Sequence, residues 1–152
     1  MKNAANEMRS VVDFLESAGA ATLEVRRLHR RLDALEARRE GLRTQKGVVA
    51  RKLVQRITEE RERELAVVGE ELESYRRVEA FVAQMPDKTY RTILRRRYLD
   101  VGKSWMEIQD DLAGDGLYYS QRHLMRLHTE ALEAARLLWN QDGEEGTAEQ
   151  RR

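Results

Sequence analysis

Apolar residues recur every three or four positions from about Ala4 to Arg43, a stretch without proline. This repeat predicts one long amphipathic helix, because residues three and four apart share a helical face. Gly19 lies inside the helix and marks a bend or a weak point. The apolar positions are Val11, Phe14, Ala18, Ala21, Val25, Leu28, Leu32, Leu35 and Leu42, interrupted at Arg39.

A second amphipathic helix is predicted from about Val48 to Gln84. Its apolar side consists of Leu53, Ile57, Val68, Leu72, Tyr75, Val78 and Val82. Between the two helices, Thr44–Gly47 predicts a turn, with Gly47 able to take a positive φ. Residues 1–85 are therefore expected to form an antiparallel coiled-coil hairpin. Its narrow core favours pairing with a second copy, a dimer by preference, or with a protein partner.

Pro86 predicts the boundary to a second domain, residues 86–140, because proline suits the first turn of a new helix. One helix is expected from about Asp87 to Asp100. Ser104 and Ser120 each predict the start of a further helix, the last reaching about Trp139. Residues 141–152 are polar and are expected to form a disordered tail. The fold class expected is all-α.

A short capped helix, a connection and a helix with long polar side chains on its outer face are typical of a helix-turn-helix. The outer face of the last helix carries Gln121, Arg122, Met125 and Arg126. Tyr119, Ser120 and His123 stand at its start. Arginine suits guanine and glutamine suits adenine in the major groove. Any exposed helix can carry such residues, so the pattern alone leaves a solvated surface as an equal alternative.

The segments KSWMEIQDDL and YSQRHLMRLHTEAL resemble region 4, the DNA-binding module of bacterial sigma factors. Together with the preceding RYL, they resemble more closely a prophage-encoded family of RinA and ArpU type, which joins an N-terminal coiled coil to a region-4-like module. The resemblance implies that Gln121, Arg122, Met125 and Arg126 face the major groove of duplex DNA, and that RNA polymerase is a further partner. Ser120, Leu124, Leu127, Ala131 and Leu132 fall on the cap and core positions of the family. One departure is the connection Ala113–Tyr119, which is longer than the usual turn.

Lys103, Arg95 and Arg96 are expected around the recognition helix as contacts to the DNA backbone. An equal alternative is that the arginines Arg95 to Arg97 only cover the surface or pair with Asp110 and Asp111. Trp105 is expected in the core because Ile108 and Leu112 follow it at helical spacing.

Composition narrows the function classes. The chain has 152 residues, 36% of them charged, no cysteine and a net charge of +1, which gives only weak support for nucleic-acid binding. No apolar run is long enough to span a bilayer and no signal peptide is visible, so a cytoplasmic protein in a bacterial host is expected. His123 and His128 do not share a helical face, and no nucleophile or phosphate-loop motif is present. We expect no metal, no cofactor and no enzymatic activity.

The sequence thus predicts a phage or prophage transcriptional regulator that binds duplex DNA. Two alternatives stay open at this point. A phage small terminase subunit also joins a helix-turn-helix to an oligomerising hairpin, but it assembles into a ring. A coiled-coil adaptor would bind protein only and would not depend on Arg122 or Arg126.

Overall fold

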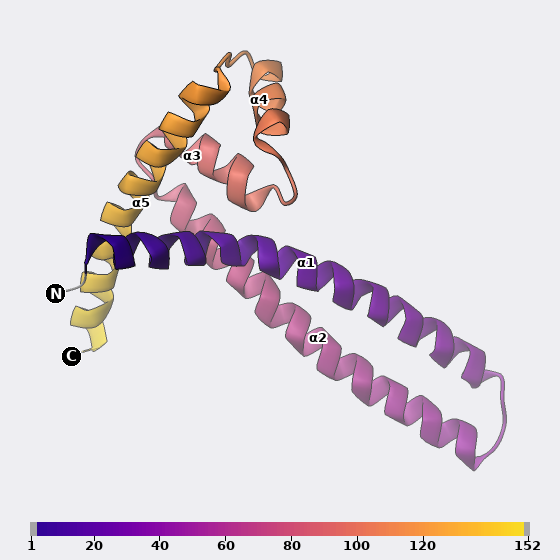
Figure 1. Cartoon of the computed structure of the whole chain (residues 1–152). Helices are drawn as coiled ribbons and strands as arrows, with labels where there is room; N and C mark the ends of the chain where they lie inside the picture. Colours follow the sequence, from indigo (N-terminus) through magenta and orange to yellow (C-terminus); the bar gives the residue numbers. More distant parts are fainter. Residues whose placement is uncertain (1–2, 151–152) are drawn as a thin grey trace. The chain divides into compact units, whose positions relative to one another are not determined.

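The computed structural model describes the backbone of residues 3–150 and the side chains of residues 3–141. Within these residues the fold is all-helical and contains no strand (Figure 1). The elements are α1 (Ala4–Arg43), α2 (Val48–Ala83), α3 (Lys88–Leu94), the π-helical segment η1 (Arg95–Leu99), α4 (Trp105–Gly114) and α5 (Gln121–Gln150). The predicted all-α class is confirmed.

The chain divides into two compact units, and α1 and α2 each contribute to both. One unit, which we call the arm, comprises residues 20–74. The other, the main unit, comprises the residues up to Gly19 together with those from Tyr75 onward. This division does not follow the boundary predicted near Met85. The start of α1 and the end of α2 belong with α3, η1 and α5, because their apolar side chains share one core.

In the arm, the end of α1 and the start of α2 lie side by side and are joined by a turn (Figure 1). Gly47 in this turn has a φ of 128°, the positive value that the sequence predicted. Arg31 on α1 reaches Glu60 at 2.6 Å and Glu64 at 3.0 Å on α2, so ion pairs link the two antiparallel segments. The buried apolar residues of the arm are Ala21, Leu28, Leu35, Ala50 and Ile57.

The main unit has its larger core where the first turns of α1 meet α2 and α5. Phe14, Phe81 and Trp139 form an aromatic group, with ring centroids 4.8 to 5.9 Å apart. Beside it, the Arg136 guanidinium on α5 lies 2.7 Å from the Glu7 carboxylate on α1. Residues near the two ends of the chain therefore hold the same core together. Its buried members are Val11, Leu15, Ala18, Val78, Phe81, Val82, Met85, Leu94, Tyr98, Leu99, Ala131 and Ala135.

A smaller core joins α3, α4 and the start of α5. Ile93, Ile108, Leu112 and Leu124 are buried in it, and Trp105 packs against them as predicted. A compact cluster of this kind fixes α4 against α5 by shape, because close-packed side chains leave little room for another arrangement.

Two elements differ from their predicted form. The helix expected from Asp87 to Asp100 is α3 followed by η1, in which the Asp100 amide bonds to the Arg95 carbonyl five residues back, at 3.0 Å. The backbone of α5 is helical as far as Gln150, where a disordered tail was expected from residue 141. Once a helix exists, each added residue gains a hydrogen bond, and no proline interrupts this stretch.

Candidate nucleic-acid interface

The start of α5 is fixed by the residue that the sequence predicted. The Ser120 hydroxyl accepts a hydrogen bond from the His123 amide at 3.1 Å, and the Ser120 carbonyl accepts one from Leu124 at 2.9 Å. A serine at this position satisfies an amide that has no partner within the helix. Leu124 is fully buried, so the helix is anchored from its first turn.

Four predicted side chains share the outer face of the first two turns. Gln121, Arg122, Met125 and Arg126 are all exposed. Gln121 is followed by Met125, and Arg122 by Arg126, at the four-residue spacing that places side chains next to each other on a helix. Neither arginine forms an ion pair with any part of the chain that the structure describes.

Beside this face lies an open depression of about 400 Å³. Ser120, Arg122, His123 and Arg126 line it, so two guanidinium groups and the capped helix start border the same space. Amide dipoles at a helix start also favour negative charge nearby. The arrangement is suited to an anionic group, and it offers no nucleophile paired with a base.

Tyr119 and His123 contact each other, with ring centroids 5.1 Å apart. Both are only partly exposed, and Tyr119 also packs against the smaller core. The Tyr119 carbonyl accepts a 2.8 Å hydrogen bond from the Gln109 side chain on α4. These two predicted site residues therefore hold the start of α5 in place more than they extend its outer face.

The connection between α4 and α5 is shorter than expected, because Ala113 and Gly114 belong to α4. The helix then ends in a Schellman turn, in which the Leu117 amide bonds to the Leu112 carbonyl at 2.8 Å and the Gly116 amide to that of Ala113 at 3.0 Å. Gly116 has a φ of 83°, the left-handed conformation that this turn requires.

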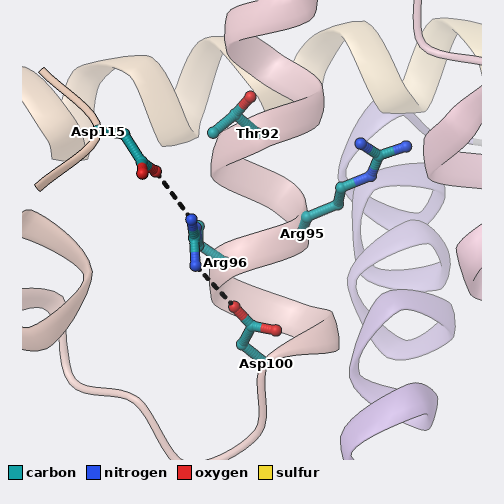
Figure 2. A pocket seen from close by; sticks show the side chains of 5 residues that line it. All are labelled: Thr92, Arg95, Arg96, Asp100 and Asp115. Carbon is teal, nitrogen blue, oxygen red and sulfur yellow. Dashed lines mark hydrogen bonds and ion pairs between the residues drawn. The ribbon is translucent and has the colours of Figure 1, made fainter. Parts of the chain in front are cut away.

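Arg96 and Lys103, which were predicted to contact the DNA backbone, instead form ion pairs with carboxylates of the chain itself. Figure 2 shows Arg96 between Asp115, at 2.9 Å, and Asp100, at 3.4 Å. Lys103 pairs with Asp111 and lies 3.7 Å from Asp100. The hydrogen bond to Asp111 raises the pKa of Lys103 above its ordinary range and lowers that of Asp111.

This alternating row of charges ties η1 to α4 and to the segment between them. Arg96 pairs with Asp100 and Asp115, and Asp111 pairs with Lys103, so neither Asp110 nor Asp111 is the arginine partner that the sequence suggested. Arg95 differs from its neighbour, because it is exposed and forms no ion pair in the described part of the chain. In Figure 2 its side chain points away from the pairs around Arg96. The space between these residues, about 390 Å³, is lined by Thr92, Arg95, Arg96, Asp100 and Asp115.

A half-buried aromatic group lies where η1, α4 and α5 meet. The Tyr98 hydroxyl is 2.8 Å from His128 Nε2, and the His128 ring lies 4.8 Å from that of Trp105. The Arg97 guanidinium lies over the Trp105 ring, with its central carbon 5.1 Å from the ring centroid. Burial, and secondly the charge of Arg97, lowers the pKa of His128 to about 4, so the ring is neutral at pH 7.

Sequence reasoning considered His128 only as a metal ligand and missed this role. No sequence signal identifies Tyr98 as its partner, because the π-helical turn that contains Tyr98 was not predicted. Among the residues with described side chains, no three His, Cys, Asp or Glu residues are grouped so that they could hold a metal ion. In the same residues, no helix combines the length and apolar character needed to cross a bilayer.

Comparisons of this chain with protein families, with characterised proteins and with solved structures find no match.

Proposed function

We propose that the protein is a sequence-specific DNA-binding regulator of transcription, of phage or prophage type. In this proposal α4 and α5 act as a helix-turn-helix, and the start of α5 enters the major groove. One observation carries the proposal. Arg122 and Arg126 are exposed side by side and lack ion pairs within the described residues, whereas Arg96 and Lys103 are neutralised.

The chemistry of the outer face suits base edges. An arginine can donate two hydrogen bonds to O6 and N7 of guanine, and Gln121 can bond to N6 and N7 of adenine. Met125, which is 44% exposed, offers an apolar contact to a thymine methyl group. Three hydrogen-bonding side chains and one apolar side chain on two turns can thus distinguish bases over a few base pairs.

Fewer residues are available to contact the DNA backbone than the sequence suggested. Arg95 is free to meet a phosphate, and the depression beside Ser120 can take another. Arg96 and Lys103 instead hold α4 at a fixed angle, which positions α5. RNA polymerase stays a second partner in the proposal, as the family resemblance implies.

A homo-oligomer, a dimer by preference, completes the proposal. It is supported by apolar side chains that the arm leaves uncovered, since Leu65 is 43% and Leu72 41% exposed on the same helix seven residues apart. The mass of the assembly in solution distinguishes a transcriptional regulator from a terminase subunit. A dimer supports a regulator, whereas a closed ring supports a terminase subunit.

The test is fluorescence anisotropy of the full chain on duplexes from its own genomic neighbourhood, at two salt concentrations. We expect tight binding to one duplex over the others. The variant Arg122→Ala/Arg126→Ala should lose about 1–3 kcal/mol per base-contacting arginine on that duplex. Arg76→Ala/Arg77→Ala is a control with equal charge change at exposed positions of α2. If the α5 variant keeps its preference for that duplex, α5 does not read sequence and a protein-binding adaptor is favoured.

A further inference from the structure

The turn end of the arm is the most basic part of the chain. Between Ala37 and Arg56 there are seven lysines and arginines and one glutamate, although the whole chain has a net charge of only +1. We call residues 37–56 the basic tip. The remainder of the chain must therefore be acidic overall, so positive charge is segregated to this tip.

Most of these positive charges have no internal partner. Arg39 pairs with Glu36 and Arg43 with Glu40, on the last turns of α1. The other five cations are exposed, and none forms an ion pair with a described residue. They are Arg38, Lys46, Arg51, Lys52 and Arg56.

The rest of the arm, residues 20–36 and 57–74, is acidic instead, with ten carboxylates and six arginines. In these segments Arg31 pairs with Glu60 and Glu64, and Arg27 pairs with Glu24. Cations and carboxylates alternate there, as is usual for a solvated helical surface. Alternating charge therefore explains that part of the arm, but it leaves the basic tip unexplained.

Gathering five unpaired cations in one place disfavours the folded state, because like charges repel and the Debye length of about 10 Å at 0.1 M salt spans neighbouring side chains. A bound polyanion removes this repulsion. Lys52 and Arg56 are one helical turn apart, about 6 Å along α2, so regularly spaced anionic groups can contact both.

We propose that the basic tip binds the phosphate backbone of duplex DNA without regard to sequence. Three of the five free cations are arginines, whose planar guanidinium groups bind phosphate through two hydrogen bonds. Five phosphate contacts would release several counterions and give a strongly salt-dependent affinity. This surface shares no residue with α5, and its binding does not require α5 to read sequence.

An anionic membrane is the other polyanion to consider. Val48 and Val49 at the tip are 57% and 73% exposed and could enter a lipid surface. A helix that lies in a membrane interface needs a broad apolar face, however, and here cations at 51, 52 and 56 follow the two valines directly. The composition favours nucleic acid.

The test measures the affinity of the full chain for a random-sequence duplex at several salt concentrations. The variant Arg51→Ala/Lys52→Ala/Arg56→Ala removes three exposed tip cations. Arg63→Ala/Arg76→Ala/Arg77→Ala is the matched control, because it removes three exposed and unpaired cations elsewhere on α2. Circular dichroism verifies that both variants keep their helices. A parallel series uses vesicles containing phosphatidylserine.

We expect the tip variant to reduce the slope of log K against log salt by about 2–3, since each phosphate contact contributes about 0.9. The control variant should keep the slope of the wild type. An unchanged slope in the tip variant, or no binding of the wild type even at low salt, overturns the proposal. Vesicle binding that the tip variant loses, with DNA binding intact, overturns it in favour of a membrane. Because the duplex is random, loss of sequence preference in the α5 variant is a separate result.

Discussion

His128 makes the stability of the fold depend on pH within a defined window. Its pKa is lowered from an ordinary 6.5 to about 4, chiefly because the ring is buried against Tyr98 and Trp105. Between these two values the unfolded chain binds a proton that the folded chain does not. Stability therefore falls as the pH drops from about 6.5 to about 4, and this contribution stays constant on either side of the window.

The magnitude follows from the size of the shift. A pKa difference from 6.5 to about 4 corresponds to about 3 kcal/mol of folding free energy. Because the ring is partly exposed, solvent reduces this contribution, and we expect about 2 kcal/mol. The loss is a substantial part of the 5–15 kcal/mol, roughly, that is typical of a domain.

The assay is urea unfolding followed by circular dichroism at pH 7, 5 and 4 for the wild type and for His128→Gln. Glutamine does not titrate and can keep a hydrogen bond to the Tyr98 hydroxyl. Carboxylates that titrate in both proteins cancel in the difference. We expect the wild type to lose about 2 kcal/mol more than the variant from pH 7 to pH 4.

An exposed histidine provides the control. His29 has a side-chain exposure of 74%, so His29→Gln should follow the wild type across the same window. Equal losses in the wild type and in His128→Gln would refute the argument, since the burial of His128 would then contribute nothing to the pH dependence.

Two further variants test packing and backbone. Trp139→Ala removes a ring whose centroid lies 4.8 Å from that of Phe14 and 5.9 Å from that of Phe81. It should lower the free energy of unfolding in urea by about 2–4 kcal/mol. A loss below about 1 kcal/mol would show that α1 is not packed on α5. Gly116→Ala places a β-carbon on a residue in the left-handed region, at φ 83°. It should lower the free energy of unfolding by about 1–2 kcal/mol and lower the Tm. An unchanged Tm would contradict the Schellman turn.

Local sequence signals identified the helices and several of their ends. The three-to-four repeat predicted α1 and α2, and Gly47 and Ser120 stand at the turn and the cap where they were expected. These features depend on a few adjacent residues, so they can be predicted from the sequence alone. The exposure of the candidate residues on the outer face of α5 was predicted in the same way, because exposure follows from helical periodicity.

Features that depend on distant partners could not be predicted. Periodicity showed that Val11 belongs to an apolar face, but not that this face packs in one core with Ala131 and Ala135. Likewise, Asp115 is far from Arg96 in sequence, and only the fold brings the two within 2.9 Å. A basic residue can therefore be named from sequence as a candidate for DNA contact. Only the structure shows whether a carboxylate of the same chain already pairs with it.

The pairing of α1 with α5 in the main unit also affects the order of folding. Arg136 and Glu7 are separated by 129 positions, so this part of the core can close only after α5 has been synthesised. The arm is different, because Arg31 and Glu60 are only 29 positions apart. On the ribosome the arm can therefore form first, while the apolar face at the start of α1 is covered only in part, by the end of α2, until α5 emerges.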